Sequence, residues 1–242
     1  MSTRTAGVDY NLEQMMGDIQ QSVRMALKSW IHLTNEGEQK KHVVAGWTSA
    51  AAIQSADVKA IKSRGESMSL YRFAGRMPVV SAKSYVSEAA VVIGDVKIDN
   101  DCYIGHGAIL RGDHGAIEVG SCTAIEEGVI IHAFSNSVCR IGKNVTIGHG
   151  AIVHAENIED YAVIGMGAIL SLHAKIGSWT IVAEGCVVKN HQIVPEGVVV
   201  AGNPAKIVRS VEARDREFWL WGKQLYVDLA QQYLRDGMEQ VK

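Results

Sequence analysis

The chain has 242 residues, of which 47% are hydrophobic and 21% are charged, and its 24 Lys and Arg stand against 26 Asp and Glu. A net charge of −2 leaves no cationic excess to bind a nucleic-acid backbone or an anionic membrane, and so few charged residues exclude a disordered chain. The longest nearly apolar stretch, residues 43–53, falls well short of the about 20 residues that cross a bilayer. We therefore expect a soluble globular protein with no nucleic-acid partner and no membrane partner.

The cysteines indicate the compartment. Cys102, Cys122, Cys139 and Cys186 are scattered without a CxxC pair, which argues against both a disulfide framework and a thiolate zinc ribbon. Arg4 lies near the N-terminus, but no apolar segment of the kind found in secretion signals follows it. The sequence therefore predicts a reducing, cytoplasmic location.

The N-terminal part of the chain carries apolar residues at helical spacing. Between positions 12 and 30 they recur every three or four residues, which predicts an amphipathic helix. These residues are Leu12, Met15, Ile19, Val23, Leu27 and Trp30. We expect a helical N-terminal extension over residues 1–67, to which the sequence assigns no chemistry.

The middle of the chain is a repeat. From Tyr85 to Val200 it is rich in Val, Ile, Gly and Ala, and aliphatic residues recur every six positions. This period fits neither an α-helix nor an alternating strand, and it predicts an internal-repeat fold in which three units form one triangular coil. The period breaks after Leu110, Ile131 and Val153, which we interpret as two insertions and one deletion. The repeating aliphatics are Val86, Val92, Ile98, Ile104, Leu110, Val119, Ile125, Ile131, Ile141, Ile147, Val153, Ile158, Ile164, Leu170, Ile176, Val182 and Val188.

This pattern resembles the left-handed parallel β-helix of hexapeptide-repeat proteins. We expect that all-β domain over residues 68–208. Residues 209–242 form the last predicted segment, a C-terminal α-helix packed along the prism or against a neighbouring subunit. Its apolar residues at helical spacing are Phe218, Trp221, Leu225, Leu229 and Tyr233.

Counting units places distant polar residues side by side. Because three units make one coil, residues three units apart share a column, and successive coils lie about 4.8 Å apart. Arg111, His132 and His154 each follow one member of such a column. We therefore expect their side chains to leave the prism in one row, with the two imidazoles on adjacent coils.

Two imidazoles so placed can bind one metal ion. The same count puts His149 in a second polar row with His106 and Glu127, one corner of the prism away, so a single chain would not aim all three histidines at one point. Catalytic zinc sites commonly have three protein ligands and one open position. We predict Zn²⁺, with Fe²⁺ or Co²⁺ as alternatives, bound by His132 and His154 of one subunit and His149 of the next, at each interface of a homotrimer.

These residues resemble a known motif set. It consists of Arg111-Gly112-Asp113, then His132, then Gly148-His149 and His154. The set is similar to that of the γ-class carbonic anhydrase-like family, most closely to its phenylacetate-degradation and carnitine-operon branch. The resemblance runs from Met68 to Met238 and implies the same metal site, with Arg111 and Asp113 as an ion pair between subunits. Residues 1–67 lie outside it, as either a genuine appendage or an over-extended reading frame.

The resemblance also implies a reaction. Many members of the family carry a Gln that orients the metal-bound water, where this chain has Glu126 followed by Glu127. We expect one of these carboxylates to accept a hydrogen bond or a proton from that water. The implied activity is reversible hydration of carbon dioxide by a metal-bound hydroxide. The alternatives are an acyl-coenzyme A thioesterase or accessory protein of thioester metabolism, and a hexapeptide-repeat acyltransferase.

Overall fold

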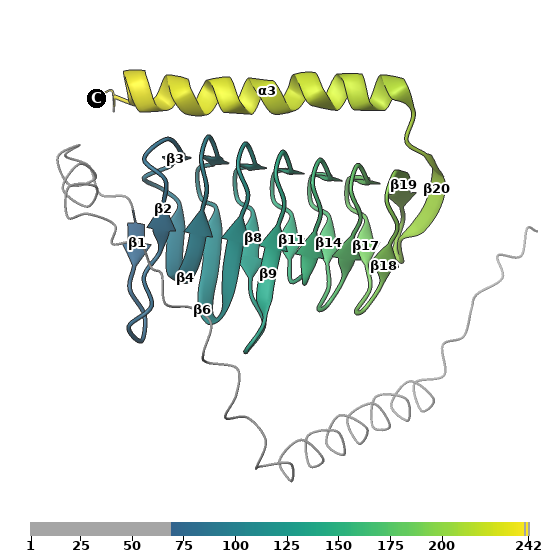
Figure 1. The fold of residues 1–242 in the computed structure, drawn as a ribbon, viewed down its shortest axis with the longest axis horizontal. Helices are drawn as coiled ribbons and strands as arrows, with labels where there is room; N and C mark the ends of the chain where they lie inside the picture. The colour runs from purple at the N-terminus through teal and green to yellow at the C-terminus, as the bar shows by residue number, and fades with distance from the viewer. Residues whose placement is uncertain (1–68, 240, 242) are drawn as a thin grey trace, which may run out of the picture. The chain divides into compact units, whose positions relative to one another are not determined.

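The computed structural model describes residues 69–239 and residue 241; the predicted N-terminal extension lies outside these residues. The described chain folds as the predicted parallel β-helix with one C-terminal helix, and Figure 1 shows the stacked coils with the helix running along them. Short parallel strands form each coil because a small residue and a turn follow almost every aliphatic position. The structure confirms the fold class.

The coils have three faces. The first face contains β1 (Ser69–Tyr71), the beginnings of β4 (Val91–Ile98) and β6 (Ile109–Val119), β8 (Ile130–His132), β11 (Ile152–Val153), β14 (Ile169–Leu170) and β17 (Val187–Val188). The second contains β2 (Val79–Val80), the ends of β4 and β6, β9 (Val138–Ile141), β12 (Asn157–Ile158), β15 (Lys175–Ile176) and β18 (Ile193–Val194). The third contains β3 (Tyr85–Val86), β5 (Tyr103–Ile104), β7 (Ala124–Ile125), β10 (Thr146–Ile147), β13 (Val163–Ile164), β16 (Ile181–Val182), β19 (Val198–Ala201) and β20 (Lys206–Ser210).

The core is the column of aliphatic side chains that the sequence predicts. Every repeating aliphatic predicted from Val86 to Val188 is buried. The register follows the unit count: Leu110 pairs with Ile131, and Ile131 pairs with Val153, on successive coils. Removing these side chains from water is the main source of stability, because a fully buried Leu or Ile contributes about 1.5–3 kcal/mol.

Two features of the chain path go beyond what the sequence predicts. The first predicted insertion, after Leu110, lies within the continuous 11-residue strand β6. There the backbones of Gly94 and Gly112 approach so closely that a Cβ at Gly94 would overlap the Gly112 carbonyl, so these positions require glycine. The predicted domain boundary at residue 208 falls inside β20, which pairs antiparallel with β19 and leads into the helix.

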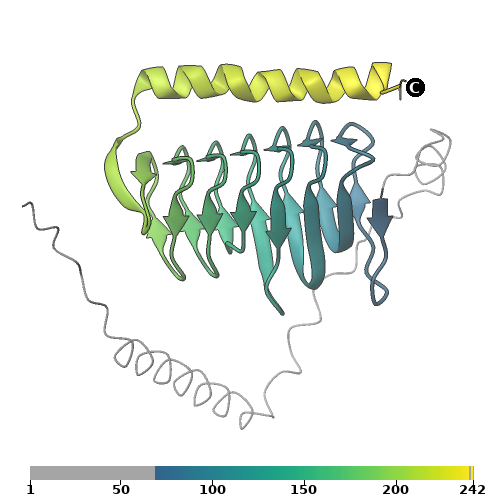
Figure 2. The same ribbon diagram turned by 180° about the vertical axis from the view of Figure 1, so that it is seen from behind.

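The C-terminal helix, α3 (Ala213–Asp236), follows the third face (Figures 1 and 2). In its first turn Asp215 accepts a hydrogen bond from the Glu212 backbone at 2.9 Å and pairs with Arg209, which fixes where the helix begins. Among the described residues, no helix is both long enough and apolar enough to cross a membrane.

The face of α3 that packs differs from the predicted stripe. Leu229 and Tyr233 contact the β-helix as expected, whereas Phe218, Trp221 and Leu225 are exposed. The packed face instead includes Lys223, Tyr226 and Ala230. The apolar pattern misses this face because a lysine stands in it, and lysine is ordinarily a surface residue. The Lys223 side chain is 3% exposed, and its Nζ donates to Thr146 Oγ1 at 3.1 Å and to the Ala162 carbonyl at 3.2 Å.

This buried amine predicts how stability depends on pH. Burial lowers the pKa of Lys223 to about 7, opposed by the nearby Glu126 charge, whereas the unfolded lysine keeps its proton up to about pH 10.4. Between these values the unfolded chain binds more protons, so stability rises with pH. We expect the wild type to gain about 2 kcal/mol over Lys223→Met between pH 7 and pH 9, measured by urea unfolding. Parallel pH profiles for the two proteins would contradict a neutral buried amine.

Candidate metal centre

Two histidines meet on the first face, as the unit count predicts. His132 ends β8, and His154 follows β11 on the next coil; their ring centroids lie 4.9 Å apart with the rings nearly perpendicular at 82°. His132 Nε2 and His154 Nδ1 are buried and have no hydrogen-bond partner. Buried polar atoms are rarely left unpaired, so these two nitrogens mark a position for a missing partner.

The protonation state of both imidazoles suits cation binding. Burial and the positive charge of Arg111 lower the pKa of each ring, so both are neutral at pH 7. A neutral ring nitrogen is the form that coordinates a metal. The pair therefore fits a zinc ion in the chemistry of its donors and in their unpaired nitrogens.

Arg111 and Asp113 lie beside this pair. Within the one chain, Arg111 Nη1 contacts Asp113 Oδ2 at 2.8 Å. The ion pair between subunits that the resemblance implies stays a prediction. Asp113 Oδ1 lies 3.5 Å from His132 Nε2, too far for a hydrogen bond. Burial alone would raise the pKa of Asp113, but the hydrogen bond and charge of Arg111 keep it below its ordinary value. Arg76, which sequence reasoning missed, donates to the Asp113 carbonyl at 2.7 Å.

His149 follows β10 on the third face, between two carboxylates. Its Nδ1 lies 2.8 Å from Glu127 Oε2, and its Nε2 lies 3.1 Å from Glu126 Oε2. The His149 backbone N–H also donates to Glu126 at 3.1 Å. The side chain is 47% exposed, so a group outside this chain can reach it. The structure thus brings together the predicted residues Glu126, Glu127 and His149.

The two glutamates differ in their electrostatics. Glu126 is 6% exposed, and burial raises its pKa although His149 and Tyr226 act in the opposite direction. Burial, the largest effect on Glu127, raises its pKa, but the hydrogen bond from Tyr103, a backbone hydrogen bond and the nearby histidines together outweigh it, so this pKa is lowered. Glu126 is therefore the stronger base of the two. Carboxylates with separated pKa values side by side are typical of acid–base sites.

One chain does not complete a metal site. Among the described residues, no three His, Cys, Asp or Glu side chains converge on a common point where a metal could bind. His132 and His154 lie on the first face, whereas His149 follows the third face, one corner away as predicted. A three-histidine centre built from these residues therefore needs a second copy of the chain.

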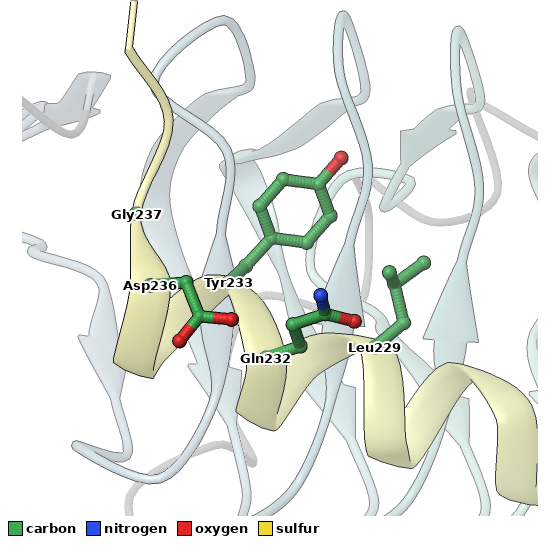
Figure 3. A pocket seen from close by; sticks show the side chains of 5 residues that line it. All are labelled: Leu229, Gln232, Tyr233, Asp236 and Gly237. Atoms are coloured by element: carbon green, nitrogen blue, oxygen red, sulfur yellow. The ribbon is translucent and has the colours of Figure 1, made fainter.

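Other histidines and hollows lie apart from this arrangement. His106 is held by Ser87 at 2.6 Å, and His173 stacks on His191 at 4.8 Å. A hollow of about 220 Å³ near the end of α3 (Figure 3) is lined by Leu229, Gln232, Tyr233, Asp236 and Gly237. None of the predicted site residues lines it.

Sequence reasoning missed Tyr103, which hydrogen-bonds to Glu127, and Tyr226, which lies next to Glu126. The unit count could have found Tyr103, because Tyr103 lies on the coil before Glu126 and pairs with Ala124, two residues before Glu126. It could not have found Tyr226, because only the docked helix brings that residue to the site.

No family model matches this chain, although individual known proteins are similar to it. It is 36% identical over 162 residues to the mitochondrial gamma carbonic anhydrase 2 of Arabidopsis thaliana, which covers 64% of this chain and 58% of the plant protein, less than two thirds of its length. A solved structure of a hexapeptide transferase family protein from Anaplasma phagocytophilum matches with a TM-score of 0.65 and 32% identity, over 69% of this chain and 98% of that one.

The bacterial relatives are covered more fully. The carnitine operon protein CaiE of Escherichia coli (strain K12) is 36% identical over 162 residues, which is 67% of this chain and 83% of CaiE. Identity at this level over most of the relative, together with the shared coil architecture, means that the chain belongs to the gamma carbonic anhydrase-like and CaiE family of hexapeptide-repeat proteins.

Proposed function

We propose that this chain is one subunit of a homotrimeric, zinc-dependent enzyme that reversibly hydrates carbon dioxide at sites between subunits. The observation that carries the proposal is the pair of facing imidazoles, His132 and His154, each with a buried, unpartnered ring nitrogen. Similarity to the plant gamma carbonic anhydrase supports the reaction. The cytoplasmic location stays a prediction from the sequence.

His132 and His154 of one subunit would hold the zinc together with His149 of the next. A zinc ion bound by three imidazoles lowers the pKa of a water molecule in its fourth position to about 7, which supplies a nucleophile at neutral pH. His149 must release one of its two carboxylates to bind. The other keeps the ring in place, because a metal-binding histidine usually donates its second ring N–H to a carboxylate.

The carboxylate that His149 releases would stay close to the water that the zinc activates. Glu126 is suited to accept its proton, because burial has raised its pKa and a general base works best when its pKa is near the working pH. Carbon dioxide and water then give bicarbonate, with the proton held at Glu126 until solvent removes it. The Arg111–Asp113 pair keeps a fixed charge beside His132, and the positive charge of Arg111 disfavours protonation of that ring.

The first face offers a surface for the second copy. Six outward-facing aliphatics stand in one unbroken column across adjacent strands. They are Val91, Ile109, Ile130, Ile152, Ile169 and Val187. Ile130, Ile152 and Ile169 are exposed in the single chain, two residues or fewer from the row of His132 and His154. A contiguous apolar column next to an incomplete metal site supports burial of this face against another subunit.

Hydrolysis of a coenzyme A thioester by the same centre is the second candidate. It is supported by the similarity to the carnitine operon protein. An acyltransferase is the third, supported by the likeness to a hexapeptide transferase family protein. Stopped-flow hydration of carbon dioxide, a panel of acyl-coenzyme A hydrolysis assays and a metal-free acetyl-transfer assay distinguish the three.

His149→Ala tests the metal centre. The purified wild type should contain about one zinc or iron per chain by mass spectrometry of the metal, and the variant should lose it together with hydration activity. Loss of a residue that hydrogen-bonds to a metal ligand weakens metal binding by about 10–100-fold, and loss of the ligand itself is expected to weaken it further. His191→Ala, which removes a histidine outside the centre, serves as the control. Equal metal content in wild type and His149→Ala would refute the proposed site.

Ile152→Glu tests the subunit contact. Covering the face would bury the new carboxylate in the middle of the aliphatic column without water or a partner, which is energetically costly. We therefore expect the trimer to dissociate and the bound metal to be lost. Light scattering after gel filtration gives the mass. The matched control is Ile193→Glu, on the second face, where the isoleucine is already 72% exposed. Dissociation of the control alone, or of neither variant, would place the contact elsewhere.

A further inference from the structure

Four tyrosines join the end of α3 to the β-helix, and we refer to them as the tyrosine cluster: Tyr85, Tyr103, Tyr226 and Tyr233. The Tyr85 and Tyr233 rings stack at 4.5 Å, and the Tyr103 and Tyr226 rings lie 5.2 Å apart. The cluster covers β3, β5 and β7, three of the strands along which α3 packs. Glu126 and Glu127 follow β7 directly, so the helix docks beside the two carboxylates.

Two members of the cluster hold these carboxylates. The Tyr103 hydroxyl donates to Glu127 Oε1 at 2.6 Å, and Tyr226 lies next to Glu126 and acts to lower the pKa of that carboxyl. Burial, reinforced by the carboxylates, raises the pKa of both phenols, which keeps their protons available for donation. The other two hydroxyls have different surroundings. Tyr85 Oη is buried without a hydrogen-bond partner, and Tyr233 Oη faces His106 at 3.4 Å.

Each carboxylate continues to the same imidazole. Two relays of tyrosine, glutamate and histidine therefore converge on His149, one through each ring nitrogen. Glycine on the coil below leaves room for the Glu127 carboxylate, because a Cβ at Gly105 would lie 2.8 Å from Glu127 Oε1 and 2.9 Å from the Glu127 backbone nitrogen. The hydrogen bond from Tyr103 holds the carboxylate in that space.

We propose that Tyr103 and Tyr226 are positioning residues for the metal centre: Tyr103 fixes Glu127 on the imidazole of His149 and so aims the ring at the neighbouring subunit, and Tyr226 holds Glu126 once the ring has released it. The inference rests on the proposed function, because it concerns the third ligand of the same centre. Since Tyr226 belongs to α3 and Tyr103 to β5, docking of the helix and the aim of His149 are coupled.

The test uses Tyr226→Phe and Tyr103→Phe, which remove one hydroxyl each and keep the stacked rings. Tyr85→Phe is the matched control, from the same cluster, and its lost hydroxyl touches neither carboxylate. Each full-length protein is loaded with Co²⁺. Its visible absorption spectrum is recorded, and its affinity for the metal is measured by competition with a chromophoric chelator. Gel filtration and thermal unfolding report assembly and stability.

Tyr226→Phe and Tyr103→Phe should each weaken Co²⁺ binding by about 10–100-fold and shift the visible bands, while Tyr85→Phe should match the wild type. A purely structural role would lower the unfolding temperature without changing the spectrum of the remaining loaded protein. Because the two tyrosines lie on different elements, loss of folding in one variant leaves the other as a test.

Two results overturn the proposal in distinguishable ways. If wild type binds Co²⁺ through His149 but both variants share the affinity and spectrum of Tyr85→Phe, the tyrosines do not position the ligand and the proposed function stands. If wild type binds no Co²⁺, and His132→Ala and His149→Ala change nothing, the proposed function fails and this inference fails with it.

Discussion

The hydrogen-bonded stacking of parallel coils is the constraint on which the rest of this structure depends. It fixes a spacing of about 4.8 Å between equivalent residues. The interior is consequently a stack of aliphatic columns, and the exterior is a set of equally regular rows. The ring centroids of His132 and His154 lie 4.9 Å apart because the backbones of the two residues are neighbours in such a row, regardless of the path of the chain between them. The fold thus supplies two aligned imidazoles without a dedicated loop.

The same regularity prevents one chain from completing a three-histidine site. Rows on different faces point in different directions, and the third histidine, His149, belongs to another corner of the prism. Side chains on a rigid scaffold keep their geometry well, but those on one face of the prism cannot reach a site on another face. In the proposed trimer, symmetry overcomes this limit because the surface next to His132 meets the surface next to His149 of another copy. Metal binding and assembly would then depend on each other.

The C-terminal helix contributes polar contacts as well as apolar packing on the third face. Its packed face contains Lys223 and Tyr226, polar residues that a core helix usually avoids unless each finds a partner. Lys223 bonds to the coils, and Tyr226 lies next to Glu126. These polar contacts fix the position of the helix along the third face more specifically than apolar packing would. They also link that position to the carboxylates around His149, so the helix, the coil and the candidate centre form one connected unit.

The sequence by itself determined the coil fold, its core column and the adjacency of His132 and His154, because a six-residue period maps directly onto a repeating backbone. It also placed Glu127 and His149 in one row, and the structure has them in contact. It did not determine which face of α3 packs, since a buried lysine reads as a surface residue. Nor did it identify Tyr226 or the pairing of Arg111 with Asp113 inside one chain. Those features arise where segments far apart in the chain, or side chains with several rotamers, meet, and only the tertiary structure decides how they do so.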